Sequence, residues 1–175
     1  PAISFATMKN WKGTVAELLD FMFDPTMTFE DLKWIREQWK GELTIKGIQT
    51  VEDAKKAAQY GADAIILSNH GGRQLDRAPV PLHLLIDVKK ELKNEIEVHL
   101  DTCIMHGADI LAAIALGADF TYVGRAYLYG LMAGGQEGVE RALTILRTEM
   151  IRNMKLLGVS SLKELEPKHV RFLPA

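Results

Sequence analysis

Several features are scarce in this sequence, and each absence narrows the class of protein. A single cysteine, Cys103, excludes an internal disulfide framework and is typical of a reducing compartment, so we expect a cytoplasmic location. No run of about 18 apolar residues is present, and no charged-then-apolar leader, so neither a membrane span nor secretion is expected. The net charge is only −2 and no basic run occurs, so nucleic acid is not an expected partner.

What the sequence does contain is an alternation of apolar runs with helical segments. Strand-like runs stand at residues 43–45, 64–67, 97–101 and 120–124. Helices are predicted after them, at about 50–61, 81–92, 107–116, 126–133 and 137–157. Alternation of this kind, with four strand-helix units of about 25 to 30 residues, implies a parallel sheet.

An internal repeat indicates which parallel fold this is. Asp53, Gly61 and Asp63 match Asp109, Gly117 and Asp119 at a constant offset of 56 positions. Two strand-helix units per repeat are what a (β/α)8 barrel assembled by duplication shows. The rival hypothesis, a Rossmann domain, requires a G-x-G-x-x-G string that this sequence lacks.

Four units make only half of such a barrel. We therefore expect an α/β chain that covers the C-terminal half of a (β/α)8 (TIM) barrel, with the other half supplied by a missing N-terminal segment or by another copy. The whole of residues 1–175 is assigned to this single domain. A helical lead-in occupies 1–40, the β/α units occupy 41–136, and C-terminal helices occupy 137–175.

The segment 68–76, Ser-Asn-His-Gly-Gly-Arg-Gln-Leu-Asp, directly follows a strand predicted to be buried on both faces. Its two glycines allow a sharp turn and close approach to a ligand. His70 can move a proton near neutral pH, and Arg73 can hold a carboxylate with two parallel hydrogen bonds. The alternative is a tight structural turn with a solvated Arg-Asp pair.

Other strand ends carry polar residues too, which is the pattern of barrel enzymes. Lys46 can stabilise developing negative charge, or can simply be a solvated lysine at the end of its strand. Arg125 can meet a phosphate at a helix N-terminus, or form a salt bridge on the barrel rim. His106 follows a third strand-end loop and can face the same site. Cys103, which has no evident activating base, is expected to be a packing residue.

The remaining histidines are weaker candidates. His83 is predicted within a helix and His99 within a strand, so both are expected to be structural or surface groups. His169 lies in the tail and is expected to be solvated. No His, Cys or Asp pair has the spacing of metal ligands, so no metal is expected.

Residues 68–76 are very similar to the signature of the FMN-dependent α-hydroxy-acid dehydrogenases and oxidases, which include glycolate oxidase, lactate dehydrogenase and mandelate dehydrogenase. Lys46 with Gly47, Asp101, and Gly124 with Arg125 stand where that family places its lysine, its aspartate-led phosphate loop and its Gly-Arg pair. The resemblance covers about residues 24 to 170 and corresponds to the family's C-terminal half.

The resemblance implies a role for each of these residues. His70 takes the proton from the substrate, and Arg73 holds the substrate carboxylate. Lys46 lies by the N1 edge of the flavin and stabilises its reduced anion. The implied FMN contacts are Lys46, Ser68, Asp101, Thr102, Cys103, Ile104, Met105, Gly124 and Arg125.

One departure from the family pattern bears on the substrate. The family's phosphate loop normally reads Asp-Gly-Gly-Ile/Val-Arg-Arg-Gly, whereas residues 101–107 read Asp-Thr-Cys-Ile-Met-His-Gly. Together with residues 124–135, this loop looks like that of the pre-mycofactocin synthases, flavoproteins that oxidise a carbon-nitrogen centre in a peptide-derived lactam. Cys103 replaces a glycine of that branch.

These observations predict an FMN-dependent oxidoreductase, with pre-mycofactocin synthase-like chemistry as the first hypothesis. The alternatives are an L-2-hydroxy-acid (lactate-like) dehydrogenase or oxidase, and an inactive half-barrel that cannot hold FMN alone. The expected partners are a small-molecule substrate and an electron acceptor, either oxygen or a redox protein. The full-length protein is expected to be a homo-oligomer.

Overall fold

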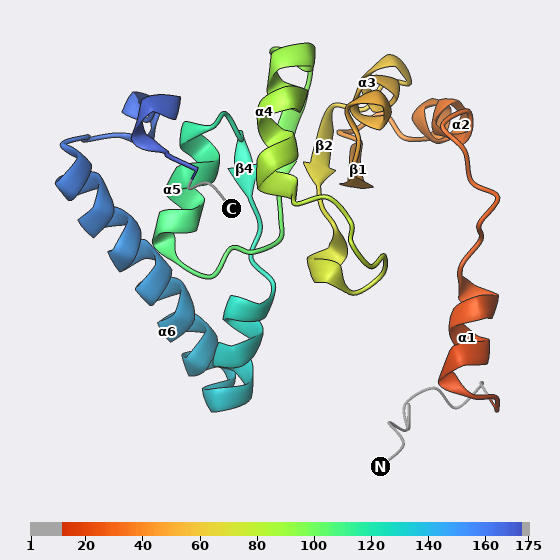
Figure 1. The fold of residues 1–175 in the computed structure, drawn as a ribbon. Helices are drawn as coiled ribbons and strands as arrows, with labels where there is room; N and C mark the ends of the chain where they lie inside the picture. Colours follow the sequence, from red (N-terminus) through yellow and green to blue (C-terminus); the bar gives the residue numbers. More distant parts are fainter. Residues whose placement is uncertain (1–11, 173–175) are drawn as a thin grey trace.

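The structure, a computed structural model, describes residues 12–172. Two short helices come first, α1 (Val15–Met22) and α2 (Asp31–Gln38). In Figure 1, α1 lies apart from the sheet and is joined to α2 by an extended segment. The first eleven residues of the predicted helical lead-in lie outside the described residues.

A four-stranded parallel sheet follows, as the alternation of strands and helices predicts. Its strands are β1 (Thr44–Ile48), β2 (Ala64–Leu67), β3 (Glu97–Leu100) and β4 (Phe120–Thr121). They pair in sequence order, β1-β2-β3-β4, and all three pairs are parallel. Within residues 12–172 both outer strands remain edges, so the barrel is not closed.

A helix follows each strand, and the first three of these helices cover one face of the sheet. They are α3 (Val51–Gln59), α4 (Pro81–Leu92), α5 (Gly107–Ala115) and α6 (Arg125–Leu157). Figure 1 shows α3 and α4 beside β1 and β2, with α5 lying against α6. None of the helices in this part of the chain combines the length and the apolar character that crossing a membrane requires.

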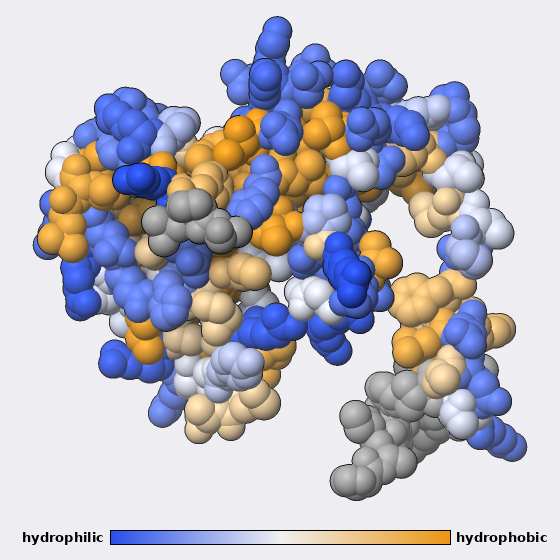
Figure 2. All heavy atoms as spheres, viewed as in Figure 1, coloured by the Kyte–Doolittle hydropathy of each residue, from blue (hydrophilic) through white to orange (hydrophobic). Residues whose placement is uncertain are grey.

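The core lies between the sheet and these helices. Ile65, Leu67, Val98 and Leu100 are almost fully buried, and they pack against small and apolar residues of α3 and α4 such as Ala57, Leu85 and Val88. Figure 2 shows that the outer side of these helices is hydrophilic, whereas hydrophobic residues lie beneath it, toward the core.

The opposite, inner face of the sheet carries a different set of side chains. Lys46, Ile66, His99 and Phe120 stand side by side in the strand register. Phe120 is 54% exposed, whereas Ile66 and His99 are buried. This inner face is therefore only partly covered by the described residues.

Two aspartates of the internal repeat, Asp63 and Asp119, make the same kind of backbone hydrogen bonds. The Leu43 amide donates to the Asp63 carboxylate at 2.7 Å, and the Asp63 amide donates back to the Leu43 carbonyl at 2.9 Å. Val98 and Asp119 form the same reciprocal pair at 2.8 and 2.9 Å. Each aspartate thereby ties the start of its own strand to the start of the preceding one.

The predicted strand limits differ from the structure, most clearly at β1 and β4. β1 does not end at Lys46-Gly47 but continues to Ile48, and its register with β2 shifts between Lys46 and Ile48. Gly47, with φ 93, lies at this irregularity and lets the strand bend while it stays paired. β4 is shorter than the predicted 120–124 and ends at Thr121. The Tyr122 amide still donates to the Leu100 carbonyl, but residues 122–124 lie outside the strand.

The C-terminal helices follow the prediction more closely. α6 is interrupted at Gly134 and Gly135, whose φ/ψ angles are non-helical, so it consists of two segments as predicted. The segments pack closely where they cross, since a Cβ on Gly138 would lie 1.9 Å from the Gly130 carbonyl oxygen. Beyond Gly158, where C-terminal helix was predicted to continue, the structure has two single turns of 3₁₀ helix, Leu162–Glu164 and Pro167–His169.

Candidate functional site

Three strands contribute polar side chains to one cluster at the carboxyl end of the sheet. The Lys46 ammonium, on the inner face of β1, lies 2.8 Å from the Asp101 carboxylate just beyond β3. It also donates to the Ser68 hydroxyl, which follows β2, at 3.1 Å. Ser68 is fully buried. The structure therefore brings together three residues that the sequence places at separate strand ends.

The electrostatics of this cluster keep Asp101 ionised. Burial raises the pKa of the carboxyl and is the largest single effect. Hydrogen bonds from Lys46, Ser68 and Thr102, with the attraction of the ammonium, together outweigh burial and lower the pKa below its ordinary value. Lys46 is thereby held by a permanent negative partner, and its side chain is still 46% exposed.

The His70 turn is built directly on this cluster. Its backbone amide donates to the Ser68 hydroxyl at 3.1 Å. His70 has φ 55, a left-handed conformation that non-glycine residues rarely adopt, and it opens a single 3₁₀ turn, η1 (His70–Gly72). Strained backbone held by surrounding contacts is common at functional sites.

Asn69 fastens the turn and was not singled out from the sequence. Its side-chain oxygen accepts from the Gly72 amide at 3.3 Å, and its side-chain nitrogen donates to the Pro79 carbonyl at 3.2 Å. The available signal was an asparagine two residues before a Gly-Gly pair, because asparagine side chains bond to backbone groups two or three residues on.

The His70 imidazole lies against Gly47 of β1. A Cβ on Gly47 would meet the imidazole Cε1 at 3.0 Å, so the glycine leaves the space that the ring occupies. Within residues 12–172 the Nδ1 of His70 is buried without a hydrogen-bond partner. This leaves Nε2 as the nitrogen available for proton transfer.

Arg73 lies just after the turn, and its side chain is exposed. In the described part of the chain it makes no hydrogen bond or ion pair. The structure therefore places Arg73 near His70 along the chain but joins the two by no contact. Its guanidinium is free to pair with an anionic group.

The loop after β3 has an unusual backbone. Thr102 and Cys103 have φ 81 and 62, although neither is glycine. The expectation that Cys103 packs in the core is wrong, because the left-handed backbone turns it outward and leaves it exposed. Ile104 is 5% exposed and belongs to the core, so only its backbone can meet a ligand. Met105 is 38% exposed and offers a thioether but no charge.

Two helix N-termini adjoin the site, and they differ in whether they can receive an anion. That of α5 is already capped, because Asp109 accepts from the Met105 and His106 amides at 2.9 and 2.8 Å. The Glu149 carboxylate accepts from the Gly107 amide at 2.7 Å. His106 lies 3.6 Å from Glu149 and is exposed, so it stabilises this cap and does not face the cluster.

The N-terminus of α6 is open. Gly124 stands at its N-cap without a side-chain cap bond, no acidic residue lies in the first turn, and nothing lies within 4 Å of a Cβ built on Gly124. Arg125 is its first residue and makes no salt bridge to any described residue. An uncapped helix N-terminus with an arginine fits a phosphate group, so the residues present are suited to the anionic end of FMN.

His99 and His83 lie outside the cluster, in positions that fit the prediction of structural or surface groups. His99 is buried, with 2.8 Å to Glu97 and 3.2 Å to the Tyr122 hydroxyl. His83 stacks edge-on against Phe172.

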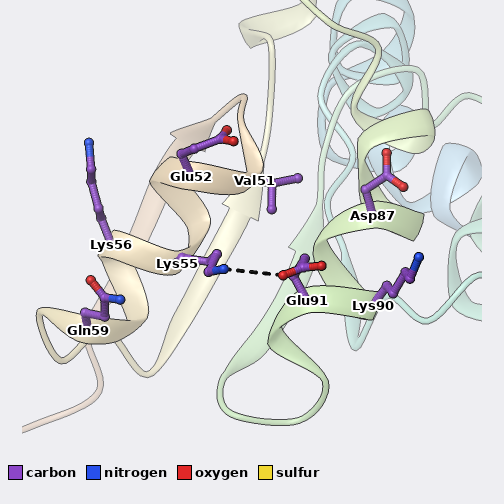
Figure 3. Close-up of a pocket in the computed structure, with 8 residues that line it drawn as sticks. All are labelled: Val51, Glu52, Lys55, Lys56, Gln59, Asp87, Lys90 and Glu91. Atoms are coloured by element: carbon purple, nitrogen blue, oxygen red, sulfur yellow. Dashed lines mark hydrogen bonds and ion pairs between the residues drawn. The ribbon is translucent and has the colours of Figure 1, made fainter.

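A separate hollow of about 530 Å³ lies between α3 and α4. Figure 3 shows that charged side chains line it, with the Lys55 ammonium 3.3 Å from the Glu91 carboxylate. Neither the cluster of Lys46, Ser68 and Asp101 nor His70 contributes to this hollow. It is a solvated groove between helices and has no part in the site at the strand ends.

Comparisons with known proteins point to one family. The sequence profile of the FMN-dependent dehydrogenases matches residues 2–172. A putative L-lactate dehydrogenase of Mycobacterium tuberculosis is 60% identical over 171 residues, which cover 98% of this chain and 41% of that protein. An L-lactate dehydrogenase of Xanthomonas campestris is 42% identical over 164 residues, covering 90% of this chain and 42% of the relative.

Solved structures agree with these matches. The monotopic membrane protein (S)-mandelate dehydrogenase superposes with a TM-score of 0.83 at 38% identity, covering 89% of this chain and 41% of that one. A flavocytochrome b2 variant with benzoylformate gives a TM-score of 0.80 at 40% identity, covering 83% and 38%. The chain thus spans about two fifths of the length of the proteins it matches.

Proposed function

This chain belongs to the FMN-dependent dehydrogenase family, and on that premise we propose that the intact protein is an FMN-dependent oxidoreductase acting on an α-hydroxy acid of the lactate type. The observation that carries the proposal is the placement of His70. Its turn stands on Ser68, within the cluster that also holds Lys46 and Asp101, and its ring lies against Gly47.

His70 serves as the base in this proposal. Oxidising a carbon that bears a hydroxyl requires the hydroxyl proton to leave, and a histidine near neutral pKa within hydrogen-bond reach can take it. Nε2 is the atom that receives the proton, because Nδ1 is buried. Arg73, exposed and unpaired among the described residues, holds the substrate carboxylate with its two parallel donors.

Lys46, Ser68, the 101–105 loop, Gly124 and Arg125 hold FMN. When bound, FMN supplies the two-electron acceptor that these side chains lack. Lys46 places a fixed positive charge where negative charge develops, and its pairing with Asp101 holds the ammonium in position. The open N-terminus of α6 and Arg125 receive the phosphate.

Substituting His70→Gln tests the proposal, because it keeps a polar side chain but removes the base. Single-turnover reduction of the flavin in the intact protein should slow by about 10²–10⁴-fold while FMN stays bound. Wild-type reduction rates in His70→Gln would overturn the assignment. An intact protein with no flavin absorbance and no affinity for added FMN would overturn the function itself.

A second candidate substrate is favoured by one specific feature, the loop residues Thr102, Ile104 and Met105 with the string 124–135; Cys103 departs from this pattern. This combination resembles the pre-mycofactocin synthase branch, in which a carbon-nitrogen centre of a peptide-derived lactam is oxidised. His70 and Arg73 serve either substrate. Stopped-flow mixing separates the two: bleaching of the flavin by L-lactate selects the hydroxy acid, and bleaching only by an aminopyrrolidinone selects the lactam.

The proposal extends to partners of the intact protein. The partners expected for the intact protein are an electron acceptor, either oxygen or a redox protein, and further copies of itself in a homo-oligomer. The described residues leave the inner face of their sheet partly open, as the exposure of Phe120 shows. We therefore expect turnover from the intact protein and not from this segment alone.

A further inference from the structure

Arg125 makes a contact that phosphate binding does not explain. Its Nη2 donates to the carbonyl oxygen of Gly71 at 2.8 Å, across 54 positions of sequence. The guanidinium nitrogens also lie 3.1 and 3.3 Å from the point that a Cβ on Gly71 would occupy. The first residue of α6 therefore covers one side of the turn that carries His70.

This turn requires support from outside itself. His70, Gly71 and Gly72 have φ values of 55, 66 and 71, so three successive residues are left-handed. For a non-glycine residue this conformation is costly, and it persists only where surrounding contacts hold it. The amides of the turn bond to Ser68 and Asn69, which belong to the same segment.

Arg125 and Gly47 supply the contacts from other elements. Gly47 of β1 meets the His70 ring, and Arg125 of α6 holds the carbonyl of the next residue. His70 is thereby held between the first and the last β/α unit of the described chain. Movement of α6 relative to β1 would displace the ring.

We propose that Arg125 is a positioning residue for His70, holding the left-handed turn through the Gly71 carbonyl, in addition to its contact with phosphate. This rests on the proposed function in so far as His70 is the base. Because Arg125 stands at the open N-terminus of α6, an anion bound there and the His70 turn share one guanidinium. Occupation of the phosphate site is in this way linked to the placement of the base.

The first test uses the exposed arginines of the same segment. Arg73 and Arg77 are trypsin sites next to the turn, so their cleavage rate in the FMN-free intact protein reports how well the turn is held. Arg125→Gln should raise cleavage at both sites by about tenfold, the effect expected when a hydrogen bond from a charged donor is lost. Arg125→Lys should restore part of the protection. Arg141→Gln, an exposed change elsewhere in α6, should leave it unchanged.

A matched pair of glycine variants keeps Arg125 in place. Gly71→Ala puts a methyl group against the guanidinium, whereas Gly72→Ala, with φ 71, meets nothing within 4 Å. Both variants add similar backbone strain, so Gly72→Ala measures the effect of strain alone on trypsin cleavage. Gly71→Ala should be cleaved faster than Gly72→Ala, because it also displaces the Arg125 guanidinium. Equal cleavage in this pair, or wild-type cleavage in Arg125→Gln, overturns the proposal.

The last readout is the rate of flavin reduction at saturating FMN. In Arg125→Gln it should fall about tenfold and recover in part in Arg125→Lys. If only FMN affinity falls, while the rate at saturation and the trypsin pattern stay as in Arg141→Gln, Arg125 is a phosphate contact alone and the proposal fails. Failure of the proposed function is separate, since it appears as absent flavin reduction in the wild type and leaves the trypsin result unaffected.

Discussion

Lys46 and Asp101 form an ion pair of 2.8 Å although the strands that precede or carry them, β1 and β3, are not neighbours in the sheet. The pair reaches across the end of β2, where the buried Ser68 hydroxyl bonds to the same ammonium. One lysine thus joins three strands of the sheet. Its ammonium helps to keep the Asp101 carboxylate ionised.

Replacing Lys46 by Met should raise the pKa of Asp101 above its value in the wild type. The ammonium lowers this pKa both by its hydrogen bond and by its charge, and burial, which raises the pKa, stays in place when the lysine is removed. In the wild type the lowered pKa stabilises the fold above the ordinary value of 3.8, and this contribution is lost as the pH falls through the lowered pKa. The stability difference between wild type and variant should therefore be widest near neutral pH and narrow on acidification.

Denaturant unfolding measured between about pH 3 and pH 7 checks this dependence. Lys55→Met is the control, since it removes a lysine whose ion pair with Glu91 is half exposed and contributes little. A difference between Lys46→Met and wild type that does not change with pH would contradict the coupling.

A methyl group at Gly47 should displace the His70 ring. Gly47→Ala places Cβ 3.0 Å from the imidazole Cε1, in addition to the cost of φ 93, which is about 1–2 kcal/mol. Gly117→Ala has a similar backbone cost at φ 103 but meets only the flexible Lys89 side chain. Both variants should lose similar stability, whereas only Gly47→Ala should slow flavin reduction, by about tenfold or more. Equal rates in the two variants would show that the contact has no part in placing the ring.

Cys103 carries removable backbone strain. At φ 62 a glycine avoids a cost of about 1–2 kcal/mol, and its greater freedom in the unfolded chain returns only part of that. Cys103→Gly should therefore increase the free energy of unfolding by roughly 0.5–1 kcal/mol. Cys103→Ala keeps the strain and should change little. Denaturant titration of both variants is the measurement, and a gain in Cys103→Ala as large as that in Cys103→Gly would refute the explanation.

Asp119 should contribute more to stability than its partial exposure indicates. It accepts from the Val98 amide at 2.8 Å and from the Lys89 ammonium at 3.0 Å. Asp119→Ala leaves the amide of a fully buried residue without its acceptor, at a cost of about 1–3 kcal/mol. Asp87→Ala, an exposed carboxylate of α4, is the matched change and should cost less than about 0.5 kcal/mol. Thermal unfolding measures the loss of stability in each variant, and equal losses in Asp119→Ala and Asp87→Ala would contradict the prediction.

Much of the site could be predicted because parallel strands expose their carboxyl ends at one edge of the sheet. Lys46, Ser68 and Asp101 each follow or end an apolar run, so their meeting depends only on the sheet being parallel. The contact of Arg125 with Gly71 could not be predicted, because it depends on how α6 starts relative to the 68–76 segment. The exposure of Cys103 depends on backbone angles that its residue type disfavours.

The end of β1 is a second example of what the sequence could not predict. Lys46 before a glycine is typical of a strand end, yet the ladder continues through Gly47 because the left-handed glycine absorbs a shift in register. A pattern of residue types cannot separate a bend from an end. Here that difference determines whether Gly47 lies beyond the sheet or beside the His70 ring.

The order β1-β2-β3-β4 also has a consequence for how the chain folds. Within residues 12–172, β1, β2 and β3 each pair with the next strand in the sequence, so each of these pairings closes a loop of roughly 20 to 35 residues. Assembly can therefore proceed strand by strand from the first β/α unit as the polypeptide leaves the ribosome. On this route the hydrogen bond between Arg125 and Gly71 can form only after the start of α6 has been made, so we expect the turn that carries His70 to be among the last parts of the described chain to become ordered.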